Sequence, residues 1–229
     1  MGKLFVKDRA IVVPGEVLAE GMDFLPVGDV VRENELLIAT KVGLVNVSGR
    51  FVKVIPLTGG YVPKERDIVI GKVVGMGFYG WRVDIGWAYE AVLSLKEGTQ
   101  EFVEKITDLS KYYNFGDYVV AQIIGVNGAM RMIDLTAKGP GLRKLGPGRL
   151  INVSPSKVPR IIGKQGSMVS MIKQYTGCRI SVGQNGLVWI GCDDPVKEML
   201  AIKAIRKIEE ESHFAGLTDK IKEMLEHGV

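Results

Sequence analysis

Two glycines separated by a cationic and a polar residue form the most specific chemical pattern in this sequence. They are Gly163 and Gly166, with Lys164 and Gln165 between them. Glycine has no side chain to keep another backbone away, and a helix that opens directly after such a loop presents unpaired N–H groups that favour phosphate. The loop 163–166 is therefore predicted to bind a nucleic-acid backbone. The alternative is a structural connection between two helices, with Lys164 as a solvated surface charge.

Positive charge gathers in the part of the sequence that contains this loop. The segment from Lys138 to Glu211 holds 13 basic and 6 acidic residues, whereas the net charge of the whole chain is only +4. Phosphate neutralisation supplies most of the non-specific affinity for nucleic acids, so this asymmetry indicates a polyanionic partner. A solvated basic surface is the alternative. Arg160 and Ile162, in the same run as the loop, are included among the predicted contacts.

A second pattern joins aromatic and basic residues around a predicted turn between strands. Phe78, Tyr79 and Trp81 lie close together, with Arg82 next to Trp81 and Lys72 in the preceding strand. Exposed aromatic rings stack on bases and contribute about 1 to 3 kcal/mol per base, while basic side chains meet phosphate. All five are predicted RNA contacts. We expect at least one of the aromatics to be core instead, because aromatics on strands usually are.

No catalytic, cofactor or metal site is predicted. The glycines of the aromatic run precede a strand, whereas loops that hold nucleotide phosphates lead into a helix. His213 and His227 belong to no motif. Asp193 and Asp194 form a carboxylate pair before a proline, which a helix N-cap explains.

The two cysteines, Cys178 and Cys192, are too few for a disulfide framework or a cysteine-only zinc site. We expect both to be small buried apolar residues, with a disulfide at the open end of a hairpin as the alternative. No apolar stretch approaches the roughly 18 residues of a membrane span, and the start of the chain has no secretory pattern. A cytoplasmic protein with no membrane partner is expected.

Residues 147–212 are predicted to form one domain with the element order β-α-α-β-β-α. The predicted elements are a strand at 150–153, a helix opening at Pro155, a helix from 167 to 175, a hairpin of 179–182 and 187–191, and a helix beginning at Pro195. Residues 163–166 fall between the first two helices. This order resembles the KH domain, whose GXXG loop, the name used below for residues 163–166, clamps about four nucleotides of single-stranded nucleic acid.

Residues 66–138 alternate between apolar and polar positions in five short runs, which predicts a five-stranded OB-fold barrel. Apolar residues at helical spacing predict a short inserted helix at 99–108. Residues 1–62 contain short Val-, Ile- and Leu-rich runs between glycines, prolines and asparagines, which predict a small all-β domain for docking. The Gly- and Pro-rich segment 138–149 is predicted to be a linker. Residues 213–229 are expected to form a C-terminal helical tail.

The whole chain, with its multidomain β plus α+β fold class, resembles the archaeal exosome cap subunit that has an N-terminal domain, an S-one-type OB domain and a KH domain. The resemblance rests on three stretches and their order: residues 13–16, the barrel segments 71–85 and 115–136, and residues 161–166. It implies single-stranded RNA, exosome ring subunits of the phosphorolytic exoribonuclease type and other cap subunits as partners. Three copies would sit on a six-membered ring, with the N-terminal domain docking and the OB domains lining the entry pore.

Two other classes of function remain open on the sequence alone. The first is a stand-alone RNA-binding regulator or translation-associated factor, which would have no need for the N-terminal domain. The second is an RNA-cleaving or nucleotide-using enzyme, which the lack of a catalytic constellation disfavours. The main prediction is a non-catalytic RNA-binding component of the exosome that guides RNA into the pore of the ring.

Overall fold

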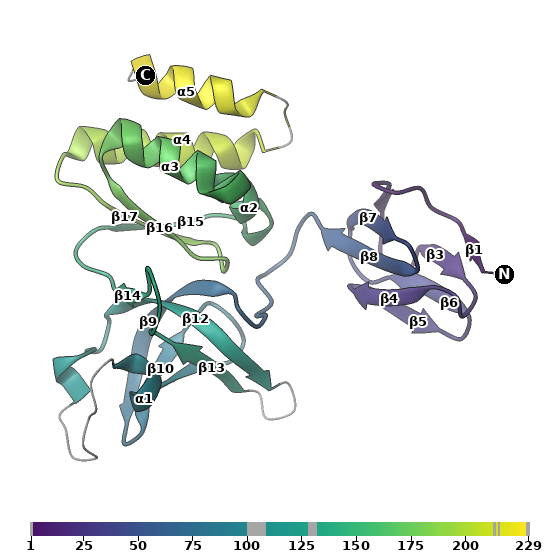
Figure 1. The fold of residues 1–229 in the computed structure, drawn as a ribbon, viewed down its shortest axis with the longest axis horizontal. Helices are drawn as coiled ribbons and strands as arrows, with labels where there is room; N and C mark the ends of the chain where they lie inside the picture. The colour runs from purple at the N-terminus through teal and green to yellow at the C-terminus, as the bar shows by residue number, and fades with distance from the viewer. Residues whose placement is uncertain (1, 100–108, 128–131, 213, 215, 228–229) are drawn as a thin grey trace. The chain divides into compact units, whose positions relative to one another are not determined.

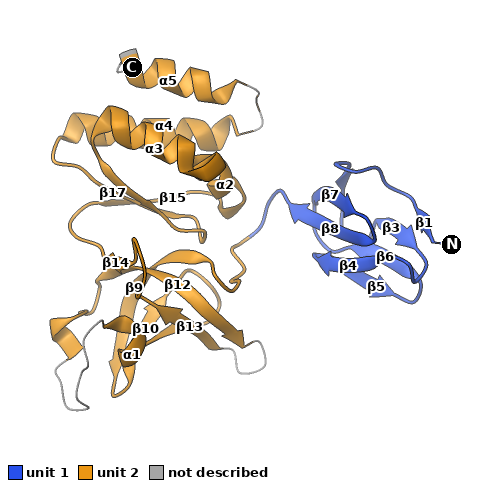
Figure 2. Ribbon diagram, viewed as in Figure 1, with its two compact units in different colours: residues 1–59 blue, residues 60–229 orange. Residues whose placement is uncertain are grey.

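The structure is a computed structural model that describes residues 2–99, 109–127, 132–212, 214 and 216–227. It divides into two compact units, residues 1–59 and residues 60–229 (Figure 2). Unit 1 is all β, and unit 2 holds a β-barrel followed by an α+β domain (Figure 1). The predicted fold class is confirmed. None of the helices in the described ranges is long and apolar enough to cross a membrane.

Unit 1 consists of two four-stranded sheets that share one aliphatic core. The first has the order β1-β3-β6-β5, formed by Lys3–Leu4, Val17–Glu20, Leu36–Ala39 and Val30–Glu33. The second has the order β2-β7-β8-β4, formed by Ile11–Val12, Gly43–Ser48, Phe51–Pro56 and Leu25–Gly28. Burial alternates along β8, so Val52 and Val54 enter the core while Phe51 and Ile55 face outward. The sequence did not predict β1, β3, β4 or β5.

The barrel of unit 2 is formed by β9 (Ile68–Gly77), β10 (Gly80–Asp84), β11 (Ala91–Ser94), β12 (Tyr118–Asn127) and β13 (Met132–Thr136). The strands follow the order β13-β11-β10-β9-β12, and β13 also pairs with β12, which closes the sheet. The five-stranded OB-type barrel is confirmed. The helix predicted at 99–108 lies outside the described residues except for its first position. Helix α1 (Leu95–Gly98) ends before it, and the short 3-10 helix η1 (Leu109–Lys111) follows.

The α+β domain has the predicted KH order. Its elements are β15 (Arg149–Asn152), α2 (Val158–Ile162), α3 (Ser167–Thr176), β16 (Arg179–Val182), β17 (Leu187–Gly191) and α4 (Pro195–Glu210), with 3-10 turns η2 (Pro155–Lys157) and η3 (Lys164–Gly166). The sheet order is β15-β17-β16, and the helices cover one face of it (Figure 1). Asp194 caps α4 by accepting a hydrogen bond from the Val196 N–H at 2.9 Å. Helix α5 (Leu217–His227) buries Leu217, Ile221 and Leu225 in the same core.

The other face of the KH sheet packs on the barrel inside unit 2. Trp189 of β17 forms a buried cluster with Ile70, Val120 and Leu145. At the β16–β17 turn, the Asn185 side-chain amide donates hydrogen bonds to the backbone carbonyls of Ile70 and Ile85, at 2.8 and 2.9 Å. A turn that the sequence predicts only as a hairpin connection therefore also fixes the KH domain to the barrel.

The segment 138–149, predicted as a linker without regular structure, takes part in this interface. Within it, β14 (Arg143–Lys144) pairs with β12, and Lys144 forms an ion pair with Asp117. Leu145 is buried in the interface cluster. The segment still joins the barrel to the KH domain, and its glycines and prolines mark turns without excluding a short edge pairing between them.

Cys178 and Cys192 form a disulfide, with their Cα atoms 4.7 Å apart. The alternative of a disulfide at the open end of the hairpin is therefore the arrangement in the structure. The hairpin register pairs Arg179 with Gly191, which places the flanking cysteines opposite each other. Cys178 is also buried, as predicted.

Candidate nucleic-acid interface

The GXXG loop has a backbone path that requires its glycines. Gly163, Gln165 and Gly166 have φ angles of +75°, +51° and +79°. A Cβ atom added at Gly163 would lie 2.7 Å from the backbone nitrogen of Met168, so substitution there meets both strain and collision. Gly163 also ends α2, where its N–H donates to the carbonyl of Pro159 at 3.0 Å. The loop thus turns the chain sharply from α2 into α3.

The side chains around this turn match the predicted contacts in several respects. Lys164, Gln165 and Arg160 are exposed, and within the described part of the chain neither cation forms an ion pair or a side-chain hydrogen bond. Ile162 is half-buried and packs against the KH core, so it offers only part of an apolar surface. Helix α3 opens at Ser167 with no acidic residue in its first turn. The positive charge of Arg160 and Lys164 therefore lies beside the start of α3, a combination that suits phosphate.

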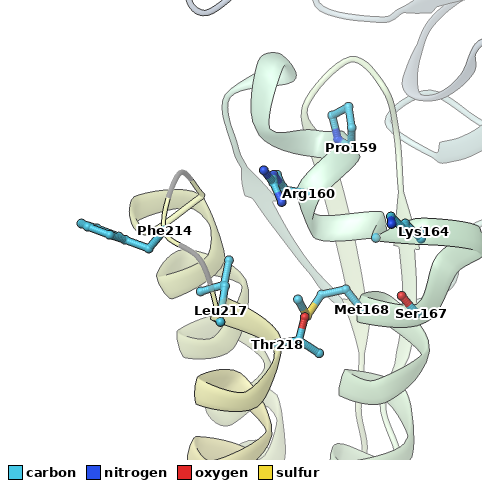
Figure 3. Close-up of a pocket in the computed structure, with 10 residues that line it drawn as sticks. Pro159, Arg160, Lys164, Ser167, Met168, Phe214, Leu217 and Thr218 are labelled. Atoms are coloured by element: carbon cyan, nitrogen blue, oxygen red, sulfur yellow. The ribbon is translucent and has the colours of Figure 1, made fainter.

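A pocket of about 650 Å³ lies beside the loop. Arg160, Lys164 and Met168 line it from the α2–α3 side, and Leu217 and Thr218 line it from the start of α5 (Figure 3). The sequence did not identify the α5 residues as part of any site. Their helical pattern predicts a helix but carries no signal for where that helix packs.

The aromatic run of the barrel divides into exposed and buried members. Phe78 and Tyr79 occupy the turn between β9 and β10 and are 94% and 87% exposed. Trp81 is 0% exposed, and its ring packs edge-to-face on Tyr113 at 4.9 Å. The Trp81 indole N–H donates to the backbone carbonyl of Tyr113 at 3.1 Å. The prediction of Trp81 as an RNA contact is therefore wrong, because the strand alternation that exposes Arg82 turns Trp81 into the barrel.

The basic residues of the barrel are accompanied by carboxylates. Arg82 forms an ion pair with Glu90 at 3.3 Å, and both side chains are exposed. Lys72 is exposed on β9 opposite Asp84 of β10. Surface ion pairs contribute only about 0 to 1 kcal/mol, so a phosphate could displace Glu90 from Arg82. The barrel face is nevertheless less positive than the KH loop, whose pocket has no acidic lining residue.

Within the described residues, no three His, Cys, Asp or Glu side chains gather as they would around a metal ion. The carboxylate of Glu209 on α4 accepts a hydrogen bond from the backbone N–H of Ser154, which precedes the first KH helix. Burial alone would raise the pKa of Glu209, but hydrogen bonds from the Ser154 N–H and from Arg206 outweigh it and hold that pKa below its usual range. This carboxylate therefore supports the fold behind the loop.

Comparison with known proteins relates these features to one family. A model of the exosome RNA binding protein RRP4 N-terminal domain matches residues 9–58, and a KH domain model matches residues 148–196. The exosome complex component Rrp4 of Thermococcus kodakarensis is 46% identical over 229 residues, which cover 98% of this chain and 88% of the relative. The Rrp4 component of Thermofilum pendens is 43% identical, with 97% of this chain and 95% of the relative covered.

A solved structure agrees with this relationship. The crystal structure of a protein classed as an exosome complex RNA-binding protein is 34% identical, has a TM-score of 0.65, and covers 74% of this chain and 97% of its own. Its similarity extends over more than one domain of the chain. With relatives above 40% identity that span nearly all of the chain, the protein belongs to the Rrp4 family of exosome complex components.

Proposed function

We propose that this chain is a non-catalytic RNA-binding component of the exosome, which captures single-stranded RNA and guides it into the pore of a phosphorolytic ring. The observation that carries the proposal is the GXXG loop, where two unpaired cations lie next to glycine backbone and the opening of a helix. The proposed site of action is cytoplasmic. The chain itself has the role of binding and orienting RNA, and the ring subunits have the role of degrading it.

The KH loop holds RNA through its backbone. Gly166, where an added Cβ atom would meet nothing closer than the Ser170 hydroxyl oxygen at 4.0 Å, lets phosphates approach the main chain closely, and Lys164 supplies a charge at the same place. Arg160 extends that charge along α2, while the exposed part of Ile162 supports a base or ribose. Because most of these contacts are with phosphate, binding weakens as salt concentration rises.

The tip of the β9–β10 hairpin is the second RNA contact. Phe78 and Tyr79 project from the turn and are available to stack on bases. Such stacking does not depend on the identity of the base. Arg82 and Lys72 add charge on the neighbouring outer face. Since the barrel and the KH domain belong to one compact unit, one RNA strand is proposed to contact both.

Unit 1 is the proposed docking domain for the ring. The outer face of the sheet β2-β7-β8-β4 carries exposed apolar side chains, namely Ile11, Leu25, Val27, Phe51 and Ile55. Contiguous exposed apolar side chains favour a protein partner. On this proposal three copies of the chain, together with other cap subunits, assemble on ring subunits of the phosphorolytic exoribonuclease type.

The test is the double substitution Lys164→Asp and Gln165→Asp, which keeps both glycines. Two carboxylates at the loop repel phosphate, so affinity for single-stranded RNA should fall while association with the ring is retained. The chain offers a matched control, because Lys173 and Gln174 form the same exposed dipeptide further along α3. Lys173→Asp with Gln174→Asp makes the same change in charge away from the loop.

Both double variants are compared with the wild type for folding by circular dichroism, for RNA affinity and for binding to the purified ring. Loss of RNA affinity only in the loop variant supports the proposal. Equal RNA affinity in the two folded variants refutes the role of the loop. Failure of the wild type to associate with the ring would favour a stand-alone RNA binder instead.

A further inference from the structure

We infer that the C-terminal segment completes a second nucleotide pocket beside the GXXG loop, and that this pocket takes a unit of the same RNA strand beyond those clamped by the loop. The inference rests on the proposed RNA-binding function and extends it to helix α5. The sequence assigns this helix no role in binding.

The pocket has the dimensions and the lining of a ligand site. Its volume of about 650 Å³ falls within the roughly 300 to 1,000 Å³ of pockets that hold small ligands. Arg160 and Lys164 supply positive charge on one side, and Met168 with Leu217 supplies an apolar surface (Figure 3). The hydroxyl of Thr218 lies on the α5 side. A phosphate, a base and a ribose together match this combination of groups.

The charges select an anion. Arg160 and Lys164 form no ion pair or side-chain hydrogen bond with any residue in the described ranges, and no acidic side chain lines the pocket. Two unpaired cations repel a metal ion and attract phosphate. Both Gly163 and Lys164 belong to the GXXG loop as well as to the pocket lining. A phosphate in the pocket would therefore be adjacent to a phosphate on the loop, which favours a continuous strand.

The wall contributed by α5 is a fixed part of the KH domain. Leu217, Ile221 and Leu225 are buried in its core, and Lys220 forms an ion pair with Glu211 at 2.6 Å. Phe214 lies at the rim, 61% exposed, with its ring directed away from Arg160 (Figure 3). The inner surface is thus defined by Leu217 and Thr218, which are the residues to probe.

Thr218 allows the charge of the pocket to be changed in both directions, because its side chain is exposed. The full-length chain is used with Phe78 and Tyr79 replaced by alanine, so that the KH domain dominates binding. Affinities for a tetranucleotide and an octanucleotide of single-stranded RNA are measured over a range of salt concentrations. The octanucleotide reaches the pocket after the loop is filled, whereas the tetranucleotide fills the loop alone.

Thr218→Lys should tighten octanucleotide binding and steepen the dependence of log K on log salt by about 0.7, the contribution of one neutralised phosphate on a single strand. Thr218→Asp should weaken octanucleotide binding, and both variants should leave the tetranucleotide affinity unchanged. Glu223→Lys is the control. It changes the net charge more than Thr218→Lys does, at an exposed position of the same helix that does not line the pocket.

Unchanged octanucleotide binding in both Thr218 variants would overturn the inference. An equal salt slope in Glu223→Lys and Thr218→Lys would also overturn the inference. The effect would then come from the net charge of the protein and not from a charge in the pocket. Lys164→Asp with Gln165→Asp serves as the reference for the loop. If it abolishes tetranucleotide binding while Thr218 has no influence, the proposed function stands and the pocket does not.

Discussion

Replacing Asn185 by alanine should weaken the attachment of the KH domain to the barrel. The Asn185 side chain makes three hydrogen bonds to barrel backbone: it donates to the carbonyls of Ile70 and Ile85 at 2.8 and 2.9 Å and accepts from the Ile70 N–H at 3.2 Å. Each contributes about 0.5 to 1.5 kcal/mol, and removing one partner leaves the other partly buried and unsatisfied. We expect the free energy of unfolding to fall by about 2 to 4 kcal/mol.

The assay is urea unfolding followed by tryptophan fluorescence, since Trp189 is buried at this interface. Gln184→Ala is the graded comparison, because Gln184 accepts a single exposed hydrogen bond from the Ile68 N–H at 2.6 Å. It should cost only about 1 kcal/mol. A cost for Asn185→Ala no larger than that for Gln184→Ala would refute the reasoning and show that the Asn185 side chain adds no more to the attachment than Gln184 does.

Two further predictions concern RNA binding and acid stability. Replacing both Phe78 and Tyr79 by alanine should lower the affinity for single-stranded RNA by about 1 to 3 kcal/mol for each stacked base, without a change in the urea midpoint; equal RNA affinity would exclude the hairpin tip as a contact. The pKa of Glu209 is held below its ordinary value of 4.5, so its stabilising effect is present above that value and is lost as pH falls through the folded-state pKa. Glu209→Gln should therefore be less stable than the wild type at neutral pH, with the difference shrinking below about pH 4; a difference that stays constant down to pH 2 would contradict this.

Features set by neighbouring residues could be predicted from the sequence. The GXXG loop depends on two glycines at fixed spacing, and the barrel strands follow from alternation over a few positions. The same alternation places Trp81 on the buried face of β10 together with Val83, whereas Arg82 lies on the exposed face. This alternation indicates Trp81 as a core residue, whereas Phe78 and Tyr79 precede the strand in the turn and are exposed.

Features set by distant residues could not be predicted. Asn185 meets Ile70 across 115 positions of the chain, and no local pattern specifies that encounter. The pocket between the GXXG loop and α5 depends on how a helix packs, which a helical pattern alone leaves open. The disulfide is different, because the hairpin register itself brings Cys178 and Cys192 together, and a predicted hairpin is enough to offer that pairing as an alternative.

On the proposed function, strand β9 has a consequence for how strongly long RNA would be held. Its Ile68–Ile70 end bonds to the KH turn, while its other end leads into Phe78 and Tyr79. The ten residues of this strand span about 30 Å, and that length separates the KH attachment from the hairpin tip. On the proposed function, an RNA strand held at one site would meet the second site at a high effective concentration, and the two modest affinities would combine as avidity. RNA too short to reach both sites, or base-paired between them, forgoes that gain.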